Sequence, residues 1–184
     1  DGLPAETQMV VTDGDSTELS KDFVVDKNGI VTEYKGSPTA VTIPARVNGT
    51  TVTGIKERLF EDKRSLTKVT ILADIKEISK WAFYGCSGLK EVVLPKGLET
   101  IGQRAFDGCI QLEEIVFPEG LKPIGYGSFS GCSGLKSIQI PLSVTEVTML
   151  AFDSCTALES LTFQEGETTE ERKIGVSAFR GCTS

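Results

Sequence analysis

The sequence predicts an α/β repeat solenoid, a right-handed coil of about six repeats that each add one strand to a parallel concave sheet and turn back through a short 3₁₀ or helical segment. Three observations lead to this prediction: cysteine, phenylalanine and leucine each recur every 23 residues. Self-similarity at a fixed period of about 20 to 50 residues is typical of solenoids, whose coils pack only on their neighbours. The recurring residues are Cys86, Cys109, Cys132 and Cys155; Phe83, Phe106, Phe129 and Phe152; and Leu89, Leu112, Leu135 and Leu158.

The first half of each repeat predicts a strand with one buried face. In one repeat the apolar residues Val92 and Leu94 flank Val93, and Pro95 follows. Such alternation is typical of a strand, which proline ends because its nitrogen cannot donate a hydrogen bond to a ladder. Strands of successive coils then pair in parallel about 4.8 Å apart. We expect six such strands, near residues 40–43, 66–71, 89–94, 112–117, 135–140 and 158–163.

The second half of each repeat predicts a short strand and a tight turn. Residues 99–101 can form a strand on the opposite side of the coil. The segment 105–109 is too short for an independent helix and suits a 3₁₀ turn. We expect the phenylalanines of these turns to be buried in one stacked column.

The N-terminal part predicts a cap. Residues 26–29, Asp-Lys-Asn-Gly, lie between two strand-like runs, which is typical of a β-hairpin. We interpret residues 22–36 as an N-terminal β-hairpin cap, because a solenoid must cover its first coil, and residues 37–184 as about six repeats. They form one repeat domain, residues 22–184, preceded by a flexible acidic N-terminal tether at residues 1–21.

The two termini carry further expectations. The chain starts without a basic or apolar leader, so we expect a mature or trimmed form. The next strand leucine would fall at position 185 and no polar cap is visible, so we expect the C-terminal cap to be absent. The strand at 158–163 then has no successor, and its open edge predicts weak self-association through the C-terminal edge.

Composition and charge exclude several classes of function. The net charge is −7, but residues 1–20 hold five acidic residues and no Lys or Arg, so the remainder is nearly neutral and lacks the basic surface of a nucleic-acid binder. The chain has no histidine, the commonest general base and metal ligand. No apolar run approaches the roughly 18 residues that span a bilayer. We therefore predict no enzyme, no cofactor or metal, no nucleic-acid partner and no membrane insertion of this segment.

The cysteines predict buried free thiols. Cysteines of an exported protein usually form disulfides. Here all five share one phase of the repeat, so neighbours stack with parallel Cβ vectors about 4.8 Å apart, whereas a disulfide needs converging Cβ atoms about 3.8 Å apart. One or more disulfides remain the alternative.

Two acidic features have alternative interpretations. Glu91 and Glu114 lie in adjacent predicted strands, where paired carboxylates can do acid–base work or hold calcium. Solvated charge on an exposed face is the commoner explanation. Residues 165–171 form an acidic segment that is either a docking loop or a solvated insertion.

The repeat has the pattern Leu-x-x-Ile/Val-x-Leu/Ile-Pro-x-x-Leu-x-x-Ile-Gly-x-x-Ala-Phe-x-Gly-Cys. It resembles the bacterial BspA-like leucine-rich repeat, over about residues 22–184. Lys63 departs from the pattern where the first coil would have its cysteine, and Ser128 departs from it where an alanine is usual. The resemblance implies a leucine-rich-repeat coil, export, an extracellular or cell-surface location, and binding of host or neighbouring-cell proteins. It implies no catalytic site. One repeat reads Leu89-Lys90-Glu91-Val92-Val93-Leu94-Pro95, then Leu98, Ile101-Gly102, Ala105-Phe106 and Gly108-Cys109.

The outward positions of the predicted sheet are the candidate ligand-binding face. Solenoids bind partners on such extended surfaces, although the same residues also simply favour strands. The leading hypothesis is a protein-binding module that serves adhesion; the alternative is a passive structural spacer of a larger surface protein. The candidate residues are Lys68, Thr70, Glu91, Val93, Glu114, Val116, Ser137, Gln139, Ser160 and Thr162.

Overall fold

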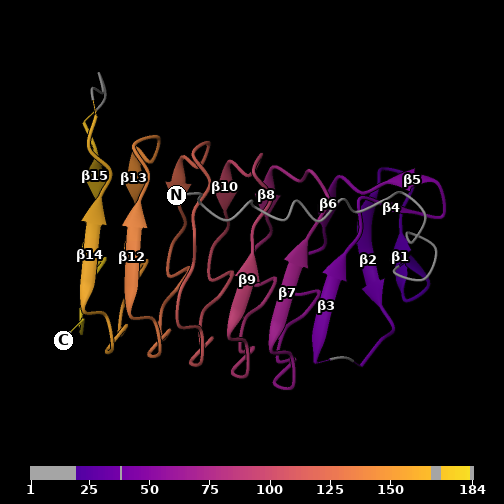
Figure 1. The fold of residues 1–184 in the computed structure, drawn as a ribbon, viewed down its shortest axis with the longest axis horizontal. Helices are drawn as coiled ribbons and strands as arrows, with labels where there is room; N and C mark the ends of the chain where they lie inside the picture. The colour runs from indigo at the N-terminus through magenta and orange to yellow at the C-terminus, as the bar shows by residue number, and fades with distance from the viewer. Residues whose placement is uncertain (1–19, 38, 167–170, 183–184) are drawn as a thin grey trace, which may run out of the picture.

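The chain winds into a β-solenoid of about six coils with parallel strands, which stack along one axis (Figure 1). The computed structural model describes residues 20–37, 39–166 and 171–182. Two ladders of strands run along the stack, a lower one and an upper one in Figure 1. Most coils contribute one strand to each ladder, and their apolar side chains fill the space between the two ladders.

The first ladder holds the longer strands. β3 (Ala40–Ile43), β7 (Lys68–Ile71) and β9 (Glu91–Val93) form one parallel sheet, and β12 (Ser137–Ile140) and β14 (Ser160–Phe163) form another. The pairing follows the repeat, as the register Val69↔Val92 and Ile138↔Leu161 shows. These strands confirm five of the six that the sequence predicts.

The prediction of a strand at residues 112–117 is wrong. This segment forms no regular strand and meets β12 only through an isolated parallel bridge between Glu114 and Ser137. We attribute the interruption to Phe117, which takes a position that is aliphatic in neighbouring coils and is only 6% exposed. Its ring packs edge-on against Phe129 and Phe152, with centroids 5.6 and 6.5 Å away. Both partners lie in its own coil or the next one, so the ring holds the segment towards the C-terminal coils.

The second ladder is continuous. It consists of five parallel two-residue strands, which confirms the short strand predicted at 99–101. Ile101 pairs with Ile124 across the same two coils whose strands are interrupted in the first ladder. The strands are β8 (Glu77–Ile78), β10 (Thr100–Ile101), β11 (Pro123–Ile124), β13 (Glu146–Val147) and β15 (Lys173–Ile174).

The turns that close the coils are not helical. The predictions of an α/β class and of 3₁₀ or helical turns are therefore wrong. The described residues of the coils form strands, turns and loops. Each turn places two residues at positive φ, between 51° and 75°, which a right-handed helix excludes. They lie two residues before and two after each turn phenylalanine: Arg58, Trp81, Arg104, Gly127, Leu150 and Ser177, and Asp62, Gly85, Gly108, Gly131, Ser154 and Gly181.

This backbone shape lets the turns form a third hydrogen-bonded array. Alternate amides donate within their own turn, as Tyr84 N–H does to the Trp81 carbonyl at 3.2 Å. The amides between them donate to the next coil, as Phe83 N–H does to the Ala105 carbonyl at 2.8 Å. Both kinds of backbone group are therefore satisfied without a helix.

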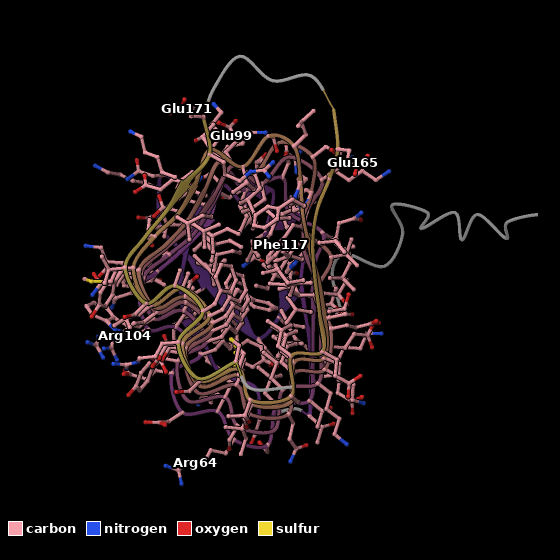
Figure 2. All side chains as sticks on the ribbon, turned by 90° about the vertical axis from the view of Figure 1, so that its left-hand side faces the viewer. Arg64, Glu99, Arg104, Phe117, Glu165 and Glu171 are labelled. Atoms are coloured by element: carbon pink, nitrogen blue, oxygen red, sulfur yellow. The ribbon has the colours of Figure 1, made fainter. Side chains whose placement is uncertain are left out.

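The core is organised around a column of phenylalanines, as predicted. Phe60, Phe83, Phe106, Phe129 and Phe152 are fully buried. Successive rings lie nearly parallel with centroids 5.2 Å apart, an offset-stacked geometry that aromatic pairs favour. Figure 2, which looks along the stack from its C-terminal end, shows Phe117 inside the coil and Arg104 on the outside of the turns.

The N-terminal region forms the predicted hairpin. β1 (Phe23–Val25) and β2 (Ile30–Tyr34) pair antiparallel, and β2 also pairs in parallel with β6 (Gly54–Ile55). A second hairpin, β4 (Arg46–Val47) and β5 (Thr50–Thr51), follows. The predicted tether falls almost entirely on residues 1–19, which lie outside the described residues. Within the described ranges no helix is long and apolar enough to cross a membrane.

Candidate protein-binding face

The structure places the candidate residues on the outward side of the first ladder. All are exposed except Thr70, which is half-buried. Between them along each strand lie buried residues such as Val92, Ile115 and Ile138, so the alternation of inside and outside positions is as the sequence predicts. The register aligns the outward residues in two columns, for example Thr70 beside Val93. We call this surface the ladder face.

The ladder face is grooved where the first ladder is interrupted. One groove, of about 330 Å³, lies between β9 and residues 114–118. A second groove, of about 230 Å³, lies between residues 114–117 and β12. Val116, between the two grooves, is 79% exposed, and Val93 on the far wall of the first is 43% exposed. The missing strand therefore gives the face a concave apolar part.

Sequence reasoning missed several residues that line these grooves. These residues come directly after the candidate strand residues in the chain and include Leu94, Lys96, Glu119 and Gln164. The signal that could have found them is Phe117, whose ring is larger than the aliphatic side chains at the matching positions of neighbouring coils, Leu94 and Ile140.

The charges on the ladder face are partly paired. Lys68 forms a 2.8 Å ion pair with Glu91 across β7 and β9. Lys136 forms a 2.6 Å ion pair with Glu113, which lowers the pKa of the glutamate and raises that of the lysine. Glu114, which borders both grooves, has no ion pair with any described residue.

The geometry favours solvated charge over an acid–base or calcium site at Glu91 and Glu114. Glu91 is engaged with a lysine from the neighbouring strand. Among the described residues, no group of three or more acidic or cysteine side chains is arranged to hold a metal ion. Of the acidic segment 165–171, residues 167–170 lie outside the described residues.

The repeat pattern seen in these coils is shared with known proteins. The family model for the BspA type leucine rich repeat region, in 6 copies, matches residues 53–184. The chain belongs to this family. A search of curated proteins finds no match.

Two solved structures of leucine-rich repeat proteins are similar to this BspA-type chain. One is a leucine rich repeat protein of Treponema pallidum, with 28% identity and a TM-score of 0.71 over 87% of this chain and 85% of that one. The other is described as a leucine rich cell surface protein of Faecalibacterium prausnitzii, with 27% identity and a TM-score of 0.70 over 87% of this chain. The match covers 50% of the F. prausnitzii protein.

The cysteines of the BspA-type coils are free, as predicted, and form a regular ladder. Each thiol donates a hydrogen bond to the carbonyl of the phenylalanine one coil earlier, such as Cys109 Sγ to Phe83 at 3.3 Å. Burial raises the pKa of Cys86 and of Cys155 to about 12. A buried thiol that stays protonated is a poor nucleophile, so these cysteines serve packing.

The outer surface of the turns carries arginine–aromatic contacts that sequence reasoning did not single out. The Arg58 guanidinium lies 4.1 Å from the centre of the Trp81 ring, and that of Arg104 lies 5.6 Å from the Tyr126 ring. Arg104 also forms a 2.9 Å ion pair with Asp107. The two arginine–aromatic contacts join successive coils on the side away from the ladder face, and the Arg104–Asp107 pair lies within one turn.

Proposed function

We propose that this chain is the protein-binding module of an exported bacterial protein displayed at the cell surface. In this proposal the ladder face binds proteins of a host or of neighbouring cells and thereby serves adhesion. The supporting comparisons are the BspA-type family and a similar protein described as a cell surface protein. The single observation that carries the proposal is a grooved, exposed sheet face with Val93 and Val116 directed outwards.

The frame behind this face suits binding. The second ladder and the turns join the coils by backbone hydrogen bonds, and a stacked phenylalanine column fills the core. A surface held by such a frame loses little conformational freedom when a partner binds. Exposed strand residues on it are therefore available for recognition at low entropic cost.

The test compares two sets of lysine substitutions on protein-coated beads. Val93→Lys, Val116→Lys and Gln139→Lys alter the ladder face, whereas Ile110→Lys, Met149→Lys and Val176→Lys alter exposed residues elsewhere. We expect beads with the natural chain or the control set to be retained on epithelial monolayers or on immobilised bacteria. Beads with the ladder-face set should be washed off, and trypsin treatment of the target surface should abolish all retention.

The alternative is a passive structural spacer of a larger surface protein. A spacer needs only a stiff stack of coils, so neither set of substitutions would change bead retention. Absence of retention by the natural chain on every surface, or equal retention by both sets, would favour the spacer.

We also propose weak self-association through the C-terminal edge. β14 and β15 are edge strands of their sheets. Leu161, Phe163 and Ile174 are exposed on this last coil, although their positions are apolar in the repeat. A second copy of the chain would cover these groups.

A further inference from the structure

The first ladder is open at one place in the middle of the stack. β9 pairs with β7 on one side, and the coil on its other side contributes residues 114–117, which form no strand pairing with β9. The same two coils stay joined elsewhere, by the pairing of Ile101 with Ile124 and by the Gly108 N–H that donates to the Ser130 carbonyl at 2.8 Å. We call the opening between β9 and residues 114–118 the seam.

Apolar residues on the ladder face coincide with the seam. Val93 and Val116 share one outward column and lie on its two walls. In the same column the strands farther away carry polar side chains. Strand propensity alone would not confine valine to the two coils that flank the opening. The polar residues of this column are Thr42, Thr70, Gln139 and Thr162.

The size of the seam suits side chains of a polypeptide. The groove holds about 330 Å³, at the lower end of the roughly 300–1,000 Å³ range of small-molecule sites. Leu94 and Phe117 complete its apolar lining. An open groove of this size accepts one or two apolar side chains from an extended segment laid across it.

The charge beside the seam favours a ligand that carries a basic residue close to the apolar side chain that enters the groove. Glu114 and Val116 are both exposed and lie on either side of the buried Ile115 in the chain, so both point outwards on the ladder face. Glu114 has no ion pair with a described residue, and Glu119 adds a second carboxylate at the neighbouring groove. Lys68 already pairs with Glu91. Lys96 also lines the seam and has no ion pair with a described residue. The unpaired charges beside the two grooves are therefore one lysine and two glutamates, and their sum is negative.

We propose that the seam binds an extended segment of a partner protein that carries an apolar side chain and a lysine or arginine two residues apart. The apolar side chain enters the groove between Val93 and Val116, and the basic side chain pairs with Glu114. Side chains two apart in an extended chain lie on one side of it, as Glu114 and Val116 do. This inference rests on the proposed function and names the class of ligand for part of the ladder face.

The test uses three synthetic peptides with blocked ends and the cores Lys-Thr-Leu, Glu-Thr-Leu and Lys-Thr-Ala. Each is titrated to millimolar concentration into the isotope-labelled chain while backbone amide NMR shifts are followed. We expect the Lys-Thr-Leu peptide to shift the amides of residues 91–94 and 114–118. The other two peptides should bind about tenfold more weakly, because each lacks one of the two contacts.

Matched variants separate the seam from the rest of the surface. Val116→Asp should weaken binding of the Lys-Thr-Leu peptide about tenfold, whereas Val176→Asp, at a valine that is 75% exposed elsewhere, should leave it unchanged. Glu114→Lys should reverse the preference to the Glu-Thr-Leu peptide, and Glu77→Lys on the second ladder should not. Unaltered spectra of these variants without peptide show that they are folded.

The outcomes distinguish this inference from the proposed function. Shifts elsewhere, equal binding of all three peptides, or no shift at millimolar peptide overturns the seam proposal. If the bead assay still depends on the ladder face in that case, the proposed function stands without the seam. If the peptides bind in the seam but beads are not retained, the seam proposal stands and adhesion fails.

Discussion

At the residue scale, Ser128 shows what one departure from the repeat costs. It occupies the column of Ala105 and Ala151, is fully buried, and its hydroxyl has no hydrogen-bond partner. Ser128→Ala should raise the free energy of unfolding by about 1–2 kcal/mol, because it removes a buried unsatisfied polar group. Urea denaturation measures the change. Ser137→Ala, on the exposed face, should stay within about 0.5 kcal/mol, and an unchanged or less stable Ser128→Ala would contradict the assignment.

The thiols make a prediction about pH at the same scale. Burial raises the pKa of Cys86 to about 12 from an ordinary value of 9.0. Above pH 9 the unfolded chain loses thiol protons that the folded chain keeps, so the free energy of unfolding should fall as pH rises from about 9 towards 12 and be unaffected by this group below 9. Urea midpoints at pH 8 and about pH 10.5 measure the change.

A control variant and a thiol count accompany that measurement. Cys86→Ala should show a smaller fall of the midpoint between the two pH values, although it is less stable overall. Titration under denaturing, non-reducing conditions should give five thiols, as the free cysteines of the structure imply. An equal fall in the variant, or a count of three or one, would contradict the buried-thiol ladder.

At the element scale, the turns depend on left-handed backbone rather than on helical hydrogen bonding. Ser154 has a φ of 60° at a position that is glycine in most other coils, such as Gly131 with a φ of 69°. Ser154→Gly should therefore stabilise the fold by about 1 kcal/mol, and Gly131→Ala should destabilise it by a similar amount. A methyl group on Gly131 would meet nothing closer than 3.7 Å, so its effect reports backbone strain. Thermal and urea melts of both variants test this, and a destabilising Ser154→Gly or a stabilising Gly131→Ala would refute it.

The interrupted strand shows that the surroundings of one phenylalanine decide whether a regular strand forms. Phe117 and Phe163 occupy the same position of the repeat, yet β14 is a regular strand and residues 114–117 are not. Phe163 is 37% exposed beneath the Arg172 guanidinium, 4.8 Å from its ring centre, whereas Phe117 is buried between coils. The same side chain disturbs the ladder only where it must fit inside the stack.

At the scale of the whole molecule, the exposed apolar groups of the last coil predict concentration-dependent association. The weight-average mass in sedimentation velocity should rise with protein concentration. Leu161→Lys together with Ile174→Lys should keep the chain monomeric, because charges placed on an apolar contact oppose its burial. Ile110→Lys, at an exposed apolar residue of the turns, is the matched control and should associate like the natural chain. A natural chain that stays monomeric at every concentration would contradict self-association.

The sequence was enough to predict the stack of coils, the phenylalanine column and the free thiols, because a repeated pattern places equivalent side chains at equivalent depths in every coil. It also determined the alternation of the ladder face, since strand residues point inwards and outwards in turn. The folded structure was needed to establish the conformation of the turns, because residues as different as Arg58, Trp81 and Leu150 adopt the left-handed conformation where inter-coil hydrogen bonds require it. It alone decided the seam, because whether Phe117 fits depends on the rings of Phe129 and Phe152 that lie against it in the folded stack.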